Sequence, residues 1–230
     1  NDKNSKIIVG PSESMSKSKK NVIDPENIIN DYGADSVRLF ILSDSPPEKD
    51  VQWSEQGMVS SYKFVQKLWM LHLQIKNKLS GEGKQIPENL ELNKFTNQLI
   101  YKITNNLESF SYNVIIANMY ETYNFLIKHI KKNINTKNLL ENYTRILTVF
   151  SPIVPHLANE CLTDIGSNEK LSWPTINQNY LKNENIDYVI QINGRKRTTV
   201  KASKDLSEEN ILNIAKHEKL LDKYLKNKPI

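Results

Sequence analysis

The chain has 230 residues, a formal net charge of +5 and 38% hydrophobic residues, enough for one sizeable domain or two to three small ones. No stretch approaches the roughly 18 to 20 uninterrupted apolar residues of a membrane-spanning helix, so we expect no membrane partner. The single cysteine, Cys161, excludes a disulfide framework and a thiolate zinc cluster within the chain. The chain starts at Asn1 without an initiator methionine or an apolar signal segment, so we interpret it as a piece of a longer polypeptide from a reducing compartment.

The first 50 residues predict a short strand, a polar loop and two helices. Residues 5–10 favour the strand, and residues 11–21 are rich in serine and lysine, as is typical of a loop. Asp24 can cap a helix whose first position is Pro25 and which ends at Gly33. A second helix is expected to stop at Pro46-Pro47. The apolar sides of the two helices are expected to be Ile28 and Ile29, and Val37, Leu39, Phe40 and Ile41.

From about residue 54 to residue 151, apolar side chains recur at helical spacing and predict four amphipathic helices. Their stripes are Phe64, Leu68, Leu71, Ile75 and Leu79; Phe95, Leu99, Ile103 and Leu107; Ile116, Met119, Tyr123, Leu126 and Ile130; and Leu139, Tyr143, Ile146 and Phe150. Ser151-Pro152 predicts the start of a fifth helix that carries Leu157 and Cys161. Short polar connections between long helices favour antiparallel neighbours in a bundle.

The periodicity changes near the end of the chain. Residues 166–183 are polar around Trp173-Pro174 and indicate a linker. Alternating apolar residues then lead into Asn193-Gly194, the strongest short signal for a β-hairpin. Ser207 is expected to cap a last helix. Two strands and a helix make a thin core, so we expect a small, incomplete α+β unit.

The loop from Met15 to Lys20 is the segment with the clearest chemical interpretation. Three lysines within four residues, Lys17, Lys19 and Lys20, can neutralise a polyphosphate, aided by backbone donors at the following helix N-terminus. Composition alone, however, favours an ordinary solvated loop.

The surroundings of this loop change that interpretation. One run contains, in order, Gly10-Pro11, Met15-Ser16-Lys17-Ser18-Lys19, Asn21, Asp24-Pro25, Tyr32-Gly33-Ala34-Asp35 and Arg38. It resembles the KMSKS signature loop of class I aminoacyl-tRNA synthetases and the helix pair after it. The continuation, Pro46-Pro47-Glu48-Lys49-Asp50 and Trp53-Ser54-Glu55-Gln56-Gly57, resembles the leucyl-tRNA synthetase family rather than its isoleucyl, valyl or methionyl relatives. Later segments agree in the family's order: Tyr62-Lys63-Phe64 with Leu68-Trp69, Ser151-Pro152 with Pro155-His156-Leu157-Ala158-Asn159-Glu160, and Gln191-Ile192-Asn193-Gly194-Arg195.

The resemblance implies a ligase that activates leucine with ATP and transfers the leucyl group to tRNA-Leu. The second lysine of the motif, here Lys17, would act catalytically by stabilising the departing pyrophosphate. The expected ATP-binding residues are Ser14, Met15, Ser16, Lys17 and Ser18. Ser14 stands where the family has the first motif lysine, so we expect a weaker charge contribution without loss of the chemistry. ATP would arrive with Mg²⁺ as substrate, and this chain offers no identifiable Mg²⁺ ligands.

The resemblance also implies a mainly α fold and a domain organisation along the chain. Residues 1–50 would be the C-terminal end of a catalytic α/β domain and 51–165 an antiparallel helical bundle of the anticodon-binding type. Residues 166–183 would be the linker and 184–230 part of a C-terminal α+β tRNA-binding domain. Neither the HIGH tetrapeptide nor an editing domain occurs in the sequence, so we expect the chain alone to be inactive.

Two sets of basic residues are candidate tRNA contacts. Lys63 and Lys67 lie one helical turn apart, and Arg195, Lys196 and Arg197 cluster at the hairpin turn. An ordinary solvated surface is the alternative for each residue. The charge distribution fits tRNA binding: residues 1–50 carry −2, residues 51–183 carry +4 and residues 184–230 carry +3.

The other chemically reactive residues favour structural roles. The four histidines, His72, His129, His156 and His217, have no metal-ligand spacing, so we expect no bound metal. Cys161 on an apolar stripe favours a buried small side chain. We expect a cytoplasmic monomer, with an organellar homologue as the alternative location. The rival functions are another aliphatic class I synthetase and a non-catalytic tRNA-binding paralogue.

Overall fold

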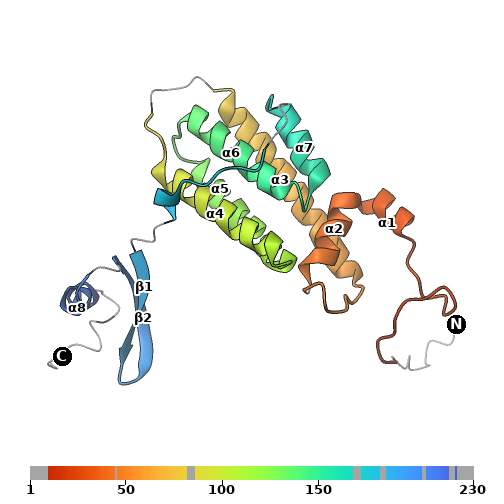
Figure 1. Cartoon of the computed structure of the whole chain (residues 1–230), viewed down its shortest axis with the longest axis horizontal. Coiled ribbons are helices and arrows are strands. Elements are labelled where there is room, and N and C mark those ends of the chain that lie inside the picture. Colours follow the sequence, from red (N-terminus) through yellow and green to blue (C-terminus); the bar gives the residue numbers. More distant parts are fainter. Residues whose placement is uncertain are drawn as a thin grey trace, which may run out of the picture. The chain divides into compact units, whose positions relative to one another are not determined.

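The computed structural model describes residues 10–44, 46–81, 86–167, 172–181, 185–203, 206–217 and 221. The chain divides into two compact units, Asn1–Ile176 and Asn177–Ile230, which are described separately below. The first unit is helical and the second contains a β-hairpin, so the predicted mainly α fold with a small α+β part is confirmed (Figure 1). None of the described helices combines the length and apolar composition needed to cross a membrane.

The first unit begins with two short helices, and their ends follow the local sequence signals. α1 (Pro25–Tyr32) is capped by Asp24, whose carboxylate accepts a hydrogen bond from Glu26 N at 3.0 Å, and it ends at Gly33 with φ 79°. The predicted cap, first-turn proline and glycine stop are therefore confirmed. α2 (Ala34–Ser43) follows directly.

Two apolar residues of this helix pair are exposed, contrary to prediction. Ile29 is 42% exposed and Ile41 is 48% exposed, whereas Leu39 and Phe40 are buried. Residues two apart on a helix point about 200° away from each other. Because Leu39 faces the bundle, Ile41 faces away from it. The helix pair thus offers the bundle a narrower apolar face than its sequence suggests.

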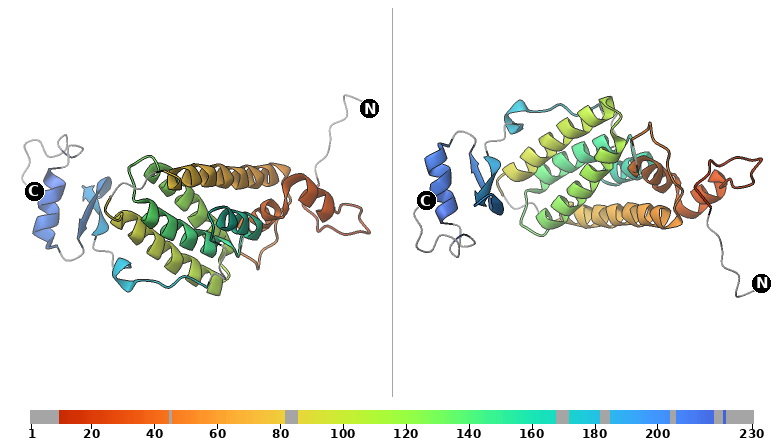
Figure 2. Two further views of the ribbon diagram at one scale, coloured as in Figure 1. Left: turned by 90° about the horizontal axis from the view of Figure 1, so that it is seen from above. Right: turned by 90° about the horizontal axis from the view of Figure 1, so that it is seen from below.

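The bundle contains long helices that lie alongside one another (Figure 2). They are α3 (Glu55–Leu79), α4 (Leu90–Glu108), α5 (Tyr112–His129), α6 (Thr136–Phe150) and α7 (Pro155–Asp164). The predicted stripes form one hydrophobic core, with Ile75, Ile103, Met119 and Leu139 fully buried. Side chains of Ser54, Asn89 and Asn135 cap three of these helices, each accepting a hydrogen bond from the backbone N–H three residues later.

The predicted start of the fifth helix is wrong. α7 begins at Pro155, not at Ser151-Pro152. The Ser151 hydroxyl donates to Thr148 O at 2.8 Å and so completes the end of α6 instead of capping a new helix. The first-turn proline of α7 is Pro155, and no side chain next to it in sequence provides a cap. The residue that does so comes from α2, as described below.

Part of the predicted linker lies against the bundle. The Trp173 indole N–H donates to Thr104 Oγ1 at 3.0 Å, and Arg145 donates to Thr175 O at 2.7 Å. Ile176 packs on the bundle core. The division between the two units, after Ile176, falls within the predicted linker.

The second unit confirms the predicted hairpin. β1 (Asn185–Ile192) and β2 (Arg195–Ser203) are antiparallel, with a bulge at Ile190/Gln191. Asn193 and Gly194 have φ values of 54° and 71°, as a two-residue hairpin turn requires. α8 (Glu208–Lys216) is capped by Ser207, as predicted, and a short 3-10 helix, η1 (Gln178–Tyr180), precedes the strands. Val200, Ala215 and Leu221 form a small core beside the sheet.

Candidate functional site

The serine and lysine loop before α1 is held in shape by Asn21. Its side chain accepts a hydrogen bond from Ser16 N at 2.9 Å and donates one to Ser14 O at 3.4 Å, so it ties the two sides of the loop together. Lys20 N donates to Lys17 O at 3.2 Å and closes a turn in which Lys20 has a φ of 52°. Asn21 belongs to the run that resembles the signature loop, but its residue type alone indicates no role for it.

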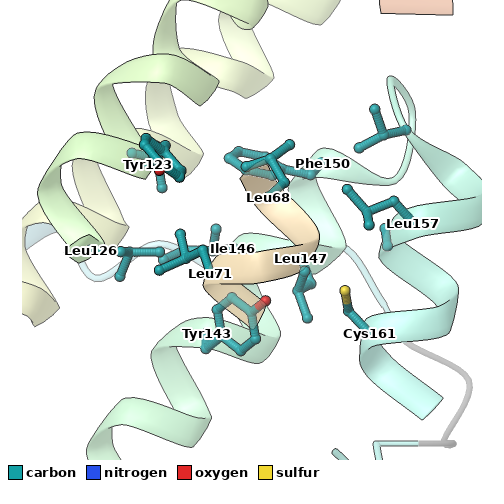
Figure 3. Close-up of a pocket in the computed structure, with 13 residues that line it drawn as sticks. Leu68, Leu71, Tyr123, Leu126, Tyr143, Ile146, Leu147, Phe150, Leu157 and Cys161 are labelled. Atoms are coloured by element: carbon teal, nitrogen blue, oxygen red, sulfur yellow. The ribbon is translucent and has the colours of Figure 1, made fainter. Parts of the chain in front are cut away.

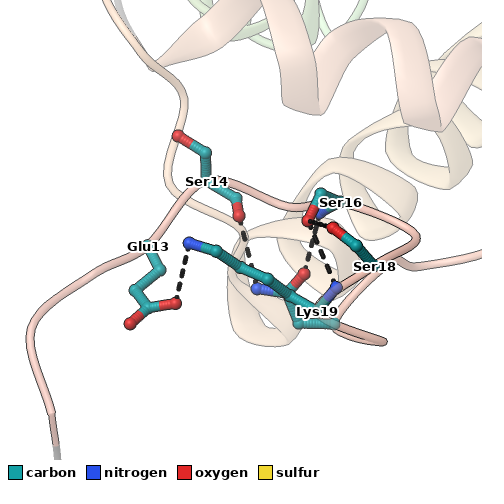
Figure 4. A network of polar contacts seen from close by, with 6 residues as sticks. Glu13, Ser14, Ser16, Ser18 and Lys19 are labelled. Carbon is teal, nitrogen blue, oxygen red and sulfur yellow. Dashed lines mark hydrogen bonds and ion pairs between the residues drawn. The ribbon is translucent and has the colours of Figure 1, made fainter.

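The loop brings together several of the predicted ATP-binding residues (Figure 4). The hydroxyls of Ser16 and Ser18 lie 3.1 Å apart, and Lys19 N donates to Ser16 Oγ at 3.3 Å. Lys19 Nζ pairs with Glu13 at 3.0 Å. Because both of these side chains are about half exposed, this ion pair adds at most about 1 kcal/mol of stability.

Lys17 differs from Lys19 in its surroundings. Its side chain is exposed at the tip of the loop, and no carboxylate of the described residues lies within ion-pair distance of its ammonium group. Met15 is also exposed, at 47%. The ammonium groups of Lys17 and Lys20 are therefore open to a ligand within the described part of the chain, while that of Lys19 is engaged by Glu13.

The helices after the loop join it to the bundle through aromatic contacts. Tyr32 at the end of α1 meets Tyr62 of α3 edge to face, with ring centroids 5.7 Å apart. Phe40 of α2 meets Trp53 in the same way at 5.2 Å. Gly57, in the first turn of α3, lets that helix approach Phe40, because a Cβ there would lie 2.8 Å from Phe40 Cε2.

A polar cluster joins α2 to the corner between α6 and α7. The buried carboxylate of Asp35 accepts hydrogen bonds from Leu157 N at 2.7 Å and His156 N at 3.3 Å, and it lies 2.9 Å from His156 Nδ1. Arg38 donates from Nε to Ile153 O at 3.0 Å and from Nη2 to Pro152 O at 2.6 Å. Asp35 thus supplies the cap that α7 lacks in its own sequence. We call the contacts of Asp35 and Arg38 with residues 152–157 the corner clamp.

The candidate tRNA-binding residues are divided between the two units. Lys63 and Lys67 are exposed on α3, in the first unit. Arg195 and Lys196 are exposed at the start of β2, in the second unit, directly after the hairpin turn. Arg197 is half-buried there. Only the first four side chains therefore present their charge fully to solvent.

The histidines of the bundle have structural partners. The ring of His72 is fully buried between Tyr143 and Asp164, with its nitrogens 3.2 Å from Tyr143 Oη and 2.9 Å from Asp164 Oδ2. Hydrogen bonds from Lys76 and His72 lower the pKa of Asp164. Within the described residues, no group of three or more histidine, cysteine, aspartate or glutamate side chains can hold a metal ion.

The core of the bundle contains a small apolar cavity between α3, α5, α6 and α7 (Figure 3). Its volume is about 20 Å³, and its lining includes Leu71, Tyr143 and Cys161. A space of this size has room for about one water molecule and no substrate. Cys161 is 1% exposed, and burial raises the pKa of its thiol to about 12, so the prediction of a buried small side chain is confirmed.

Comparisons with known proteins agree with this arrangement. The family described as tRNA synthetases class I (I, L, M and V) matches residues 5–54, and the family described as anticodon-binding domain of tRNA ligase matches residues 89–212. The leucine–tRNA ligase of Bartonella tribocorum is 36% identical over 218 residues, which cover 90% of this chain and 25% of that protein. The leucine–tRNA ligase of Parvibaculum lavamentivorans is 32% identical over 233 residues, covering 97% of this chain and 27% of that protein.

A solved structure is also similar. It is the ternary complex of Agrobacterium radiobacter LeuRS, tRNA and LeuAMS, with a TM-score of 0.73 and 26% identity over 94% of this chain and 29% of that chain. The chain thus spans about a quarter of the length of the curated relatives it matches. Together with the loop, the helix pair and the bundle, these matches confirm the resemblance found in the sequence: the chain belongs to the leucyl-tRNA synthetase family of class I tRNA synthetases.

Proposed function

We propose that the protein containing this chain activates leucine with ATP and transfers the leucyl group to tRNA-Leu. The observation that carries the proposal is the exposed loop, in which Lys17 has no ion-pair partner among the described residues, joined through α1 and α2 to a bundle of the tRNA-ligase type. The sequence similarity to leucine–tRNA ligases supports leucine as the amino acid. Because the chain spans only a quarter of those ligases, we propose that it needs the rest of the protein for activity.

In the proposed first step, the leucine carboxylate attacks the α-phosphate of ATP. The bond from that phosphorus to the bridging oxygen breaks, and pyrophosphate leaves with the electron pair. Negative charge therefore grows on the pyrophosphate in the transition state, and Lys17 would stabilise it there. ATP would enter with Mg²⁺ as its counter-ion, and the described residues offer no ligand cluster for that ion.

Ser14, Ser16 and Ser18 would complete the phosphate-binding surface. In the observed loop, the Ser16 and Ser18 hydroxyls hydrogen-bond to each other and Ser16 Oγ accepts from Lys19 N, which fixes the loop shape without using the Lys17 ammonium. Ser14 holds Asn21 through its backbone carbonyl, so its hydroxyl is not needed for that contact. A serine here can donate a hydrogen bond to phosphate but supplies no charge.

In the proposed second step, a ribose hydroxyl of the terminal tRNA adenosine attacks the leucyl carbonyl, and AMP leaves. The bundle and the hairpin unit would hold the tRNA through Lys63, Lys67, Arg195, Lys196 and Arg197. Each lysine offers a point charge, whereas Arg195 can bind a phosphate in a bidentate manner. We place this reaction in the cytoplasm, which is supported by the bacterial origin of the relatives.

The test is the effect of Lys17→Ala on leucine-dependent ATP–pyrophosphate exchange by the complete enzyme. We expect the exchange rate to fall at least tenfold, which corresponds to about 1.4 kcal/mol of lost transition-state stabilisation. Ser14→Lys should leave the rate equal or higher, because it adds a charge beside the same phosphates. Lys20→Ala is the matched control from the same loop, and its rate should stay within about twofold of the wild type. An unchanged rate for Lys17→Ala would refute the assigned role of the loop.

A further inference from the structure

The corner clamp is a polar junction between two parts of the chain that are far apart in sequence. Asp35 and Arg38 lie on α2, and their partners at residues 152–157 lie more than 110 positions later. α2 also packs against α3, α5 and α7. Through α1, α2 is continuous with the loop that carries Lys17. The clamp therefore connects the loop segment to the corner from which α7 starts.

The clamp satisfies backbone groups that have few other partners. Leu157 N and His156 N are in the first turn of α7, where backbone N–H groups lack partners within the helix. Arg38 binds two successive carbonyls, of Pro152 and Ile153, in the turn between α6 and α7. The Asp35 side chain is 7% exposed, so water has little access to these backbone groups and cannot easily replace the hydrogen bonds of its carboxylate. Hydrogen bonds to charged groups in such a position are stronger than neutral ones.

The hydrogen bonds of the corner clamp also fix its geometry. Asp35 uses one carboxylate oxygen for Leu157 N and the other for His156, and Arg38 uses two different nitrogens. Five directed contacts from one helix restrict both the distance and the rotation of the corner relative to α2. The exposed imidazole of His156 contributes least, because its side chain is 76% exposed.

We propose that Asp35 and Arg38 are positioning residues that orient the tRNA-holding bundle relative to the loop segment during leucyl transfer. This inference rests on the proposed function. tRNA bound to the bundle must place its terminal ribose hydroxyl at the leucyl carbonyl, and a displacement of about 1 Å between reacting groups can reduce the rate about 100-fold. Activation of leucine involves no tRNA, so it does not depend on this orientation.

The proposal predicts a separation of the two steps in the complete enzyme. For Asp35→Asn and for Arg38→Gln, we expect leucine-dependent ATP–pyrophosphate exchange per active site within about threefold of the wild type. Single-turnover transfer from enzyme-bound leucyl-adenylate to tRNA-Leu should fall at least tenfold. The Kd for tRNA-Leu should stay within about threefold, because no proposed tRNA-binding residue is changed. Arg38→Lys keeps a donor for one carbonyl and should recover most of the transfer rate.

Controls separate this role from a general loss of structure. Asp31→Asn makes the same chemical change on the exposed side of α1 and should leave both steps unchanged. Rates are normalised by active-site titration, so partial unfolding lowers the number of active sites and not the rate of either step. If Asp35→Asn fails to fold, Arg38→Gln decides the outcome, because it leaves the cap of α7 intact.

Three results would overturn the inference. The first is an equal fall in exchange and transfer per active site, and the second is a transfer rate that none of the clamp variants changes. The third is a tRNA Kd that rises in proportion to the lost transfer rate, since the clamp would then act on binding. A wild-type enzyme without leucine-dependent exchange would instead refute the proposed function, so the two failures are distinguishable.

Discussion

The contact between Gly57 and Phe40 predicts that Gly57→Ala destabilises the first unit. The added Cβ would lie 2.8 Å from Phe40 Cε2 and 3.2 Å from Phe40 Cδ2, compared with an optimal carbon–carbon separation of about 3.5–4.0 Å. The ring cannot easily move away, because Phe40 is 5% exposed and meets Trp53 edge to face. Overpacking of this kind costs about 1–3 kcal/mol.

A competing effect favours the substitution. Alanine is a better helix former than glycine by about 1 kcal/mol in a helix interior, and Gly57 lies in the first turn of α3. We therefore expect a net loss of about 1–2 kcal/mol in the free energy of unfolding. Urea unfolding followed by tryptophan fluorescence measures this, because all three tryptophans, Trp53, Trp69 and Trp173, belong to the first unit.

A double-mutant cycle with Phe40→Leu identifies the cause. Leucine lacks the Cε2 atom that the new methyl group would meet, so in that background Gly57→Ala should change the free energy of unfolding by less than about 0.5 kcal/mol. Gln56→Ala, at an exposed position one residue earlier, is the control and should also stay within about 0.5 kcal/mol. If Gly57→Ala stabilises the unit in the wild-type background, the close approach of α3 to Phe40 is refuted.

Three other predictions concern charge and burial. The folded pKa of Asp164 is lowered below its ordinary value of 3.8, so its carboxylate stabilises the unit above that pH and loses the effect as the pH falls. Asp164→Asn should therefore lower the urea midpoint at pH 7. The difference from the wild type should shrink below pH 3.8. Since burial raises the thiol pKa of Cys161 to about 12, iodoacetamide at pH 8 should modify the folded chain at least about 100-fold more slowly than the urea-unfolded chain. Arg195→Ala with Lys196→Ala in the complete enzyme should weaken tRNA binding and reduce the slope of log K against log salt by about 0.7–0.9 per lost phosphate contact, whereas Lys201→Ala on the same strand should not.

Local signals in the sequence predicted local structure correctly. Asp24, Pro25 and Gly33 define the two ends of α1 because each acts on backbone groups within a few residues of itself. Asn193-Gly194 predicted the hairpin for the same reason, since both residues tolerate the positive φ that the turn needs. The apolar stripes also predicted the bundle helices correctly, because the spacing of the stripes depends only on the helix period.

The errors arose where a distant residue decides the local structure. Ser151-Pro152 is a typical helix beginning and predicts a start there, but the cap of α7 is provided by Asp35, 122 positions before Leu157. Ile29 and Ile41 were expected inside because they are apolar, yet the direction in which each faces depends on where α1 and α2 meet the bundle. Neither fact can be obtained from nearby residues.

The candidate loop was only partly predictable. The resemblance selected Lys17 and the neighbouring serines, whereas composition alone favoured a solvated loop. The pairing of Lys19 with Glu13 and the two hydrogen bonds of Asn21 depend on how the loop folds back on itself, which residue types alone do not specify. The ion pair with Glu13 distinguishes Lys19 from Lys17, whose ammonium remains available to a ligand.

Amino-acid specificity tests the central claim most directly. The complete protein containing this chain should catalyse ATP–pyrophosphate exchange with leucine and charge tRNA-Leu, and its kcat/KM for isoleucine, valine and methionine should be far lower. Exchange that responds best to one of those amino acids would assign the chain to a different aliphatic synthetase. Binding of tRNA-Leu without exchange for any amino acid would contradict the proposed catalysis and indicate a tRNA-binding paralogue.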